Sequence, residues 1–67
     1  MNNDQVRVLT HLAYRKVYVE KTEIESAWHF EALDTALAAL LKAKRIATLN
    51  EVKYRITAKG RSALKKG

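Results

Sequence analysis

The sequence predicts a small, mostly helical α+β domain. Three observations carry this prediction: a leucine-rich segment with helical spacing, two short β-favouring runs separated by a turn, and the absence of proline and of any glycine before residue 60. With 67 residues, of which 48% are hydrophobic, the chain has enough apolar material for one thin core. Residues 1–67 are therefore expected to form a single domain.

Basic residues are concentrated in the second half of the chain. Residues 1–41 carry four Lys or Arg against six Asp or Glu, whereas residues 42–67 carry nine against one, and the net charge is +6. Such an excess favours acidic partners, of which nucleic acid comes first and an anionic membrane surface second. The sequence has no cysteine, which excludes thiol chemistry and cysteine-type zinc sites.

A first helix is expected over residues 4–15. Asn3 or Asp4 can accept its first free amide hydrogens, and apolar residues follow at helical spacing. The expected buried positions are Val6, Leu9, Leu12 and Ala13. The β-favouring run Val17–Val19 is too short for a helix and predicts a strand.

A second helix is expected from Glu23 to Trp28 or His29. Thr22 and Glu25 stand three residues apart, which is the spacing of a capping box at a helix start. Its expected buried side chains are Ile24, Ala27 and Trp28.

The most regular amphipathic pattern predicts a third helix over residues 31–44. Its buried face is expected to comprise Leu33, Leu37, Leu40 and Leu41. Lys42 and Lys44 suit the negative end of the helix dipole.

Two strands, over 46–48 and 52–57, are expected to form a hairpin around a three-residue turn. This turn length pairs Ile46 with Tyr54, so that Ile46, Tyr54 and Ile56 face inward. Lys53 and Arg55 then point to solvent. Thr57 is expected to cap a last short helix over 58–66 that buries Leu64.

Two local patterns accompany this order of elements. Tyr54 to Arg61, followed by Leu64, reads Y-R-I-T-A-K-G-R-x-x-L, and Leu37-x-x-Leu40 is followed by basic residues and Ile46. Together with the order helix, strand, helix, helix, hairpin, helix, they resemble a winged helix-turn-helix domain, similar to small MarR-like and PadR-like regulators. The resemblance covers about residues 4–64. One departure from the family pattern is that Lys44 and Arg45 stand where a glycine usually precedes the wing.

The resemblance implies a double-stranded DNA-binding protein, a small transcriptional regulator that places helix 31–44 in the major groove and the wing 46–57 on the backbone. The expected base-facing residues are Glu31, Ala32, Thr35, Ala38 and Ala39. The expected phosphate contacts are Lys21, Thr22, Lys42, Lys53 and Arg55. Asn50 and Glu51 form the wing tip, where Asn50 is best able to adopt a left-handed conformation. Arg, Asn and Gln are missing from the base-facing set, so we expect salt-dependent binding with little direct readout.

A protein-interaction or assembly module that does not bind DNA is the alternative hypothesis. The alanine-rich side of helix 31–44 would let a partner helix approach closely, and Glu31 and Asp34 would repel phosphate. An enzyme is not expected, because His11, on the exposed side of the first helix, and His29, in a turn, lack the spacing of a metal site or triad. No cofactor, metal or small-molecule ligand is expected, and Trp28 and Phe30 are interpreted as packing residues.

No run of residues is long and apolar enough to span a bilayer, and the polar start of the chain differs from a secretory signal. We therefore expect a cytoplasmic protein. Small domains often gain stability by self-association. Val8, Tyr14 and Tyr18 are the apolar residues left over for a homodimer patch.

Overall fold

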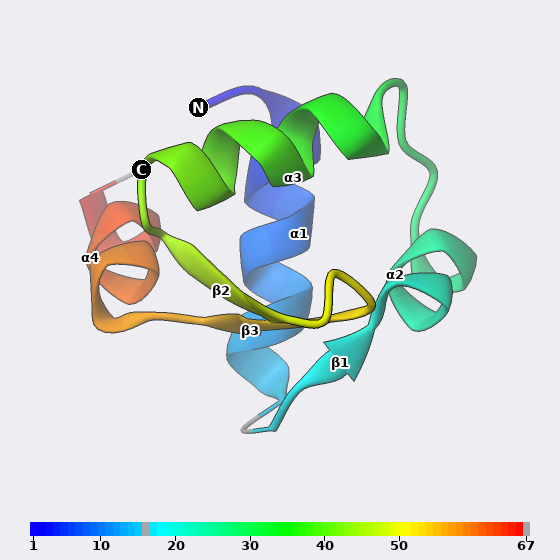
Figure 1. The fold of residues 1–67 in the computed structure, drawn as a ribbon. Coiled ribbons are helices and arrows are strands. Elements are labelled where there is room, and N and C mark those ends of the chain that lie inside the picture. The colour runs from blue at the N-terminus through cyan, green and yellow to red at the C-terminus, as the bar shows by residue number, and fades with distance from the viewer. Residues whose placement is uncertain (16, 67) are drawn as a thin grey trace.

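The computed structural model describes residues 1–15 and 17–66 (Figure 1). These residues form four helices and one three-stranded antiparallel sheet of strand order β1-β3-β2. This confirms the predicted α+β class. The elements are α1 (Asn3–Tyr14), β1 (Val19–Glu20), α2 (Lys21–Ala27), α3 (Leu33–Lys42), β2 (Ile46–Leu49), β3 (Lys53–Ile56) and α4 (Ala58–Lys66).

Helix α1 is the centre of the molecule, because α3, β3 and α4 all pack against it. In Figure 1, α3 crosses the upper part of α1 and the sheet crosses its lower part. The largest side chains that are almost inaccessible to solvent are Val8, Leu9, Leu12, Val19, Ile24 and Leu40. No helix among residues 1–15 and 17–66 has the length and apolar character needed to cross a membrane.

The expected homodimer patch does not exist as one surface. Val8 is fully buried in the core, and Tyr18 is half-buried beneath Arg55, whereas Tyr14 is 83% exposed. Periodicity also misplaced Val6, which is 38% exposed. Val8 is buried because α3, β3 and α4 all pack against α1 and together cover more of this helix than one narrow stripe.

The first helix is capped by Asn2 and not by the predicted Asn3 or Asp4. The Asn2 Oδ1 atom accepts a hydrogen bond of 2.9 Å from the amide of Gln5. Asp4 is 7% exposed, and its carboxylate reaches across to the segment before α3. Its two oxygens accept hydrogen bonds from the amides of Glu31 and Ala32. Asp4 thus supports the start of α3, which has no side-chain cap of its own.

The predicted capping box at Thr22 is wrong. Helix α2 begins at Lys21, one residue before Thr22, and its N-cap residue Glu20 makes no side-chain cap. The Lys21 amide instead donates to the Val52 carbonyl at a distance of 3.0 Å. The hairpin therefore satisfies an amide that a capping side chain would otherwise have to satisfy. The helix ends at Ala27, which is exposed although it was expected to be buried.

The hairpin register differs from the predicted one by two residues. Ile46 pairs with Ile56 and Thr48 pairs with Tyr54, whereas a turn over 49–51 would pair Ile46 with Tyr54. The turn contains three residues, Asn50 to Val52. Because a shift of two preserves the alternation of faces, Ile46, Tyr54 and Ile56 are buried as predicted.

Thr57 and Gly60 join the end of α3 to the start of α4. The Thr57 hydroxyl accepts a hydrogen bond from the Gly60 amide and donates one to the Lys44 carbonyl. A Cβ atom on Gly60 would lie 2.1 Å from the Arg45 carbonyl oxygen and 2.8 Å from an Ile56 carbon. The Y-R-I-T-A-K-G segment therefore builds an internal joint that requires glycine at position 60.

Candidate nucleic-acid interface

Helix α3 has one exposed side. Leu37 and Leu40 are buried against the core, whereas Thr35, Ala38 and Lys42 are exposed. Ala39, which was also expected to face outward, is half-buried. The outward side carries the small side chains of Thr35 and Ala38 and has the cation of Lys42 at its end, as periodicity predicted. It is a smooth surface that another molecule can approach closely.

Two of the expected base-facing residues precede α3. The helix spans residues 33–42 and not 31–44, so Glu31 and Ala32 lie in the connection from α2. Both side chains are exposed, but both amides donate to Asp4. The guanidinium of Arg7 donates to the His29 carbonyl at 2.8 Å and holds the same connection.

Lys21, an expected phosphate contact, is already paired with carboxylates. Its Nζ atom lies 2.5 Å from Asp34 Oδ1 and 3.8 Å from Glu25 Oε1. The hydrogen bond with Asp34 raises the pKa of Lys21. This pair also neutralises Asp34 at the start of α3. Thr22, next in sequence, is exposed, while the Lys21 charge is not free for a phosphate.

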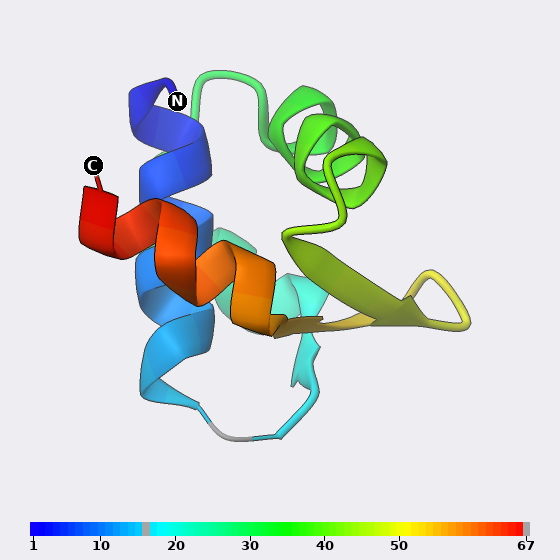
Figure 2. The same cartoon turned by 90° about the vertical axis from the view of Figure 1, so that its left-hand side faces the viewer.

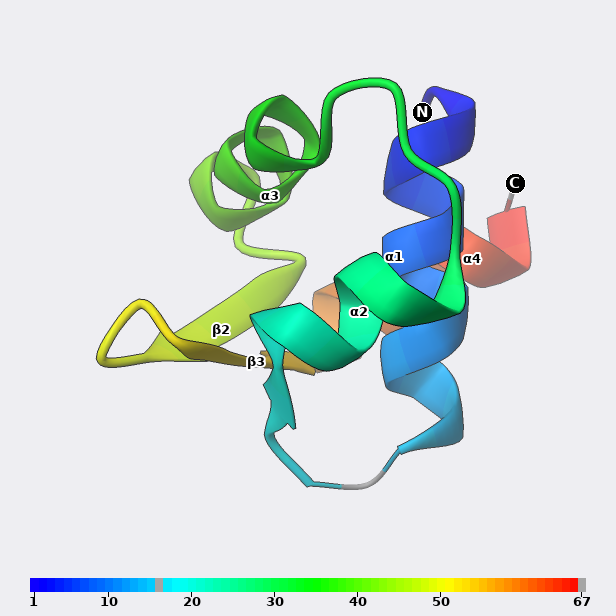
Figure 3. The same ribbon diagram turned by 90° about the vertical axis from the view of Figure 1, so that its right-hand side faces the viewer.

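The hairpin turn projects on the same side of the molecule as α3. Figures 2 and 3 show both elements on one side, with α1 and α4 on the other. Asn50 and Glu51 both adopt left-handed backbone conformations, with φ of 55° and 57°. The left-handed conformation predicted for Asn50 is thus confirmed and extends to Glu51. Leu49 and Val52 flank this turn and are 45% and 55% exposed.

The two basic residues of β3 share one face of the sheet but lie at different distances from the turn. Lys53 and Arg55 are exposed and alternate with the buried Tyr54, so they leave the sheet on the face opposite to the core. Lys53 pairs with Leu49 next to the turn. Arg55 lies one pleat further from the turn, with its guanidinium carbon 5.6 Å from the centre of the Tyr18 ring. Lys53 can therefore contact a ligand that touches the turn, whereas Arg55 lies further from the turn and against Tyr18.

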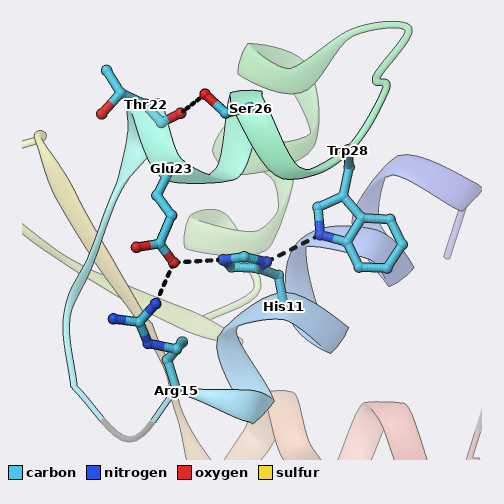
Figure 4. A network of polar contacts seen from close by, with 6 residues as sticks. All are labelled: His11, Arg15, Thr22, Glu23, Ser26 and Trp28. Carbon is cyan, nitrogen blue, oxygen red and sulfur yellow. Dashed lines mark hydrogen bonds and ion pairs between the residues drawn. The ribbon is translucent and has the colours of Figure 1, made fainter.

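His11 is not the exposed residue that the sequence predicted. Its side chain is 16% exposed and lies between α2 and the indole of Trp28 (Figure 4). The Trp28 Nε1–H donates to His11 Nδ1 at 3.1 Å. Because the indole nitrogen can only donate, the proton of the neutral imidazole lies on Nε2, which donates to Glu23 at 2.8 Å. Arg15 Nη1 lies 2.6 Å from the same Glu23 oxygen. These contacts fix α2 to α1.

The sequence reasoning missed two contributors to the α3 side of the molecule. Lys44 is exposed just beyond α3, and it was interpreted only as a partner of the helix dipole. Val52 is exposed in the turn because the register differs by two residues. A signal existed for Lys44, since it stands where the resembled family places a glycine at a helix end.

No protein-family model, curated protein or solved structure matches this chain. Within residues 1–15 and 17–66, no three His, Cys, Asp or Glu side chains gather in a way that could hold a metal ion.

Proposed function

We propose that this chain is a winged-helix domain that binds double-stranded DNA, with α3 in the major groove and the hairpin turn as a minimal wing on the backbone. One observation carries the proposal: the uncovered side of α3 and the turn between β2 and β3 project from a common side (Figures 2 and 3). The order of the elements is also that of the winged helix-turn-helix domains that the sequence resembles. A regulator of transcription is the role that this mode of binding fits.

The cations near this side support backbone contacts. Lys42 and Lys44 lie at the end of α3 and Lys53 lies beside the turn, and all three are exposed. None of them has a carboxylate partner within 4.0 Å among the described residues. Three phosphate contacts would give a slope of log affinity against log salt of about −3. This set does not include Lys21, which is paired with carboxylates, or Arg55, which lies further from the turn and against Tyr18.

Base recognition would be weak and would rest on methyl groups. Thr35 and Ala38 can contact the methyl group of thymine, and the Thr35 hydroxyl can bond a base or a phosphate. Glu31 can accept a hydrogen bond from a cytosine amine. No Arg, Asn or Gln is present in α3 to read guanine or adenine by two hydrogen bonds. DNA shape then contributes as much to preference as side chains do.

The first experiment compares two variants that lose the same charge. Lys42→Ala with Lys53→Ala removes two proposed phosphate contacts, whereas Lys65→Ala with Lys66→Ala removes two cations at the far end of α4. We expect the first pair to weaken binding to all duplexes and to reduce the salt slope by about 2. Fluorescence anisotropy at two salt concentrations measures this. An equal loss in both pairs would mean that binding is diffuse and does not use α3.

Thr35→Val tests whether α3 meets bases. This substitution keeps a methyl group and removes the hydroxyl. It should change the sequences enriched from a random duplex library while the salt slope stays the same. An unchanged set of sequences would place α3 outside the groove.

A protein-interaction module is the second candidate, and the exposed Leu49 and Val52 favour it. These apolar side chains flank the turn, which projects on the same side of the molecule as the alanine-rich side of α3. A partner protein could cover such a surface. Titration followed by NMR separates the two functions. Duplex DNA should shift the amides of α3 and of the turn, and the absence of any shift there with every duplex would favour the interaction module.

A further inference from the structure

A second basic surface lies away from α3. Arg15, Arg55 and Arg61 line a hollow of about 250 Å³ together with the apolar Ile56. These arginines come from the end of α1, from β3 and from the first half of α4. In Figures 1 to 3, α3 lies at the top of the molecule and the end of α1 that carries Arg15 lies at the bottom. A ligand on α3 therefore leaves the Arg15 end of this hollow free.

The charge of the hollow is not compensated by the chain itself. Of the three arginines, only Arg15 has a carboxylate within 4.0 Å among the described residues, namely Glu23 at 2.6 Å. A guanidinium group has five N–H donors, so Arg15 keeps donors for another acceptor. Helix α4, which carries Arg61, contains no acidic residue. Like charges on residues that line one hollow repel one another, and an anion bound there offsets this repulsion.

The side chains of the hollow are suited to phosphate. Arginine presents two parallel N–H groups that match two oxygens of a phosphate. The contact between Arg55 and the face of the Tyr18 ring holds this guanidinium in place while its edge stays available. Arg55 covers one face of the Tyr18 ring, and none of the described residues that line the hollow is aromatic, so the hollow itself offers a nucleobase no ring on which to stack. The hollow thus has the chemistry to bind a backbone phosphate without reading sequence.

A membrane surface fits this side of the molecule less well. Leu64 is the one large apolar residue of α4, and it packs against the core. An amphipathic helix that binds lipid needs an outward apolar face to insert. A polyanion that offers phosphates at a regular spacing, without an apolar layer, is the better match.

We propose that the Arg15, Arg55 and Arg61 hollow binds backbone phosphates of a nucleic acid independently of α3, as a second contact on another side of the molecule. The choice of nucleic acid as the ligand rests on the proposed function, while the phosphate chemistry rests on the three arginines alone.

The test follows the arginine side-chain Nε–H signals and the α3 backbone amides by NMR during titration with a short duplex. We expect both sets to shift. Arg55→Ala with Arg61→Ala should abolish the shift at Arg15, leave the α3 shifts in place and lower the affinity by about tenfold at low salt. Arg55→Lys with Arg61→Lys keeps the positive charges but lacks the parallel N–H groups of arginine. This variant should bind more tightly than the double alanine variant and less tightly than the parent protein. Lys65→Ala with Lys66→Ala is the charge-matched control.

The two proposals fail in different ways. Arginine signals that do not move at saturating duplex, while α3 amides do, would overturn the second contact and leave the α3 interface standing. Shifts of the arginine signals without shifts of the α3 amides would overturn the α3 interface and leave the second contact standing. Anionic phosphatidylglycerol vesicles and polyglutamate serve as competing ligands. Tighter binding of either one than of the duplex at the arginines would overturn the assignment to nucleic acid.

Discussion

Lys44 ends helix α3 in the left-handed conformation, with φ of 61°. The Arg45 amide donates to the Leu40 carbonyl at 2.9 Å, and the Lys44 amide donates to the Leu41 carbonyl at 3.0 Å. These two bonds form a Schellman motif, in which the left-handed residue is usually glycine. A lysine here has a Cβ atom that crowds the following carbonyl, at a cost of about 1–2 kcal/mol.

Lys44→Gly should therefore stabilise the protein. Relief of the crowding exceeds the additional chain entropy that glycine brings to the unfolded state, which is about 0.5–1 kcal/mol. We expect a net gain of about 0.5–1 kcal/mol in the free energy of unfolding, measured by urea denaturation. The control is Ala43→Gly, because Ala43 precedes it with a right-handed φ of −82°. That change should destabilise, and a loss of stability in both variants would contradict the argument.

Gly60→Ala should destabilise the protein for the opposite reason. The added methyl group would lie 2.1 Å from the Arg45 carbonyl oxygen, so the backbone of α4 or of the segment after α3 must move. Overpacking of this kind costs about 1–3 kcal/mol. The urea midpoint checks this, with the exposed Ser62→Ala in the same helix expected to change it little. A midpoint that matches the parent protein would show that α4 shifts freely.

For single residues, the sequence correctly predicted those roles that are set by neighbours along the chain. Tyr54, Ile56 and Thr57 are placed by strand alternation and by a helix start, and their predicted roles are confirmed. Val8 and His11 were misplaced, because their surroundings come from elements that are distant in sequence. A pattern within one helix cannot reveal that two other elements cover it.

At the scale of elements, Glu23 links α2 to α1. The hydrogen bond from His11, followed by the charge of Arg15, holds the pKa of Glu23 below its ordinary value of 4.5. A carboxyl group whose pKa is lowered by folding stabilises the folded state above pH 4.5, and this contribution is lost as the pH falls through the lowered pKa.

Glu23→Gln should thus destabilise the protein more at pH 7 than at pH 3, because the parent loses the same contribution on acidification. Thermal unfolding at both pH values measures the difference. Glu20→Gln is the control, since Glu20 is exposed and has no ion pair among the described residues. An equal effect of Glu23→Gln at the two pH values would show that the charge of Glu23 does not act here.

Asp4 links α1 to the start of α3 through two amides. Asp4→Ala leaves these amides without their acceptor, which costs about 1–3 kcal/mol. Amide hydrogen exchange should therefore accelerate at Glu31 and Ala32 more than in α4. Asn3→Ala, at an exposed neighbour, should leave exchange unchanged. Unaltered protection at Glu31 and Ala32 in the Asp4 variant would contradict this role.

The predictions that failed for elements share a physical cause. The capping box was wrong because the Val52 carbonyl, about thirty positions later, satisfies the Lys21 amide. The hairpin register was wrong because the turn takes Val52 in place of Leu49, although the alternation of faces stayed correct. Periodicity defines which face of an element is buried, while partners from elsewhere decide where the element begins and ends.

For the whole molecule, the sequence predicted the exposed side of α3 but not the placement of the cations. The excess charge of residues 42–67 was visible from composition alone. Composition could not show that Arg55 lines a hollow with Arg15 and Arg61. This arrangement depends on the position of β3 between β1 and β2 in the sheet. The surface of the second basic site is assembled from three distant segments and has no signature in any one of them.

Two nucleic-acid contacts on different sides would let one molecule hold two duplexes. We expect a bead-bound duplex to retain a second, labelled duplex only in the presence of the protein. Excess protein should abolish the retention by saturating each duplex separately. Arg55→Ala with Arg61→Ala should remove most of it, whereas Lys65→Ala with Lys66→Ala should not. Equal retention with all three proteins would contradict a two-sided molecule.

The joint between α3 and α4 has a consequence for how this protein could diversify. The most recognisable stretch of the sequence contains Tyr54, Ile56, Thr57 and Gly60. In the structure these residues pack in the core and connect the end of α3 to the start of α4. None of them contributes to the outward side of α3. Chains that share this signature would have the same fold but could bind different partners. The signature alone does not indicate what each chain recognises.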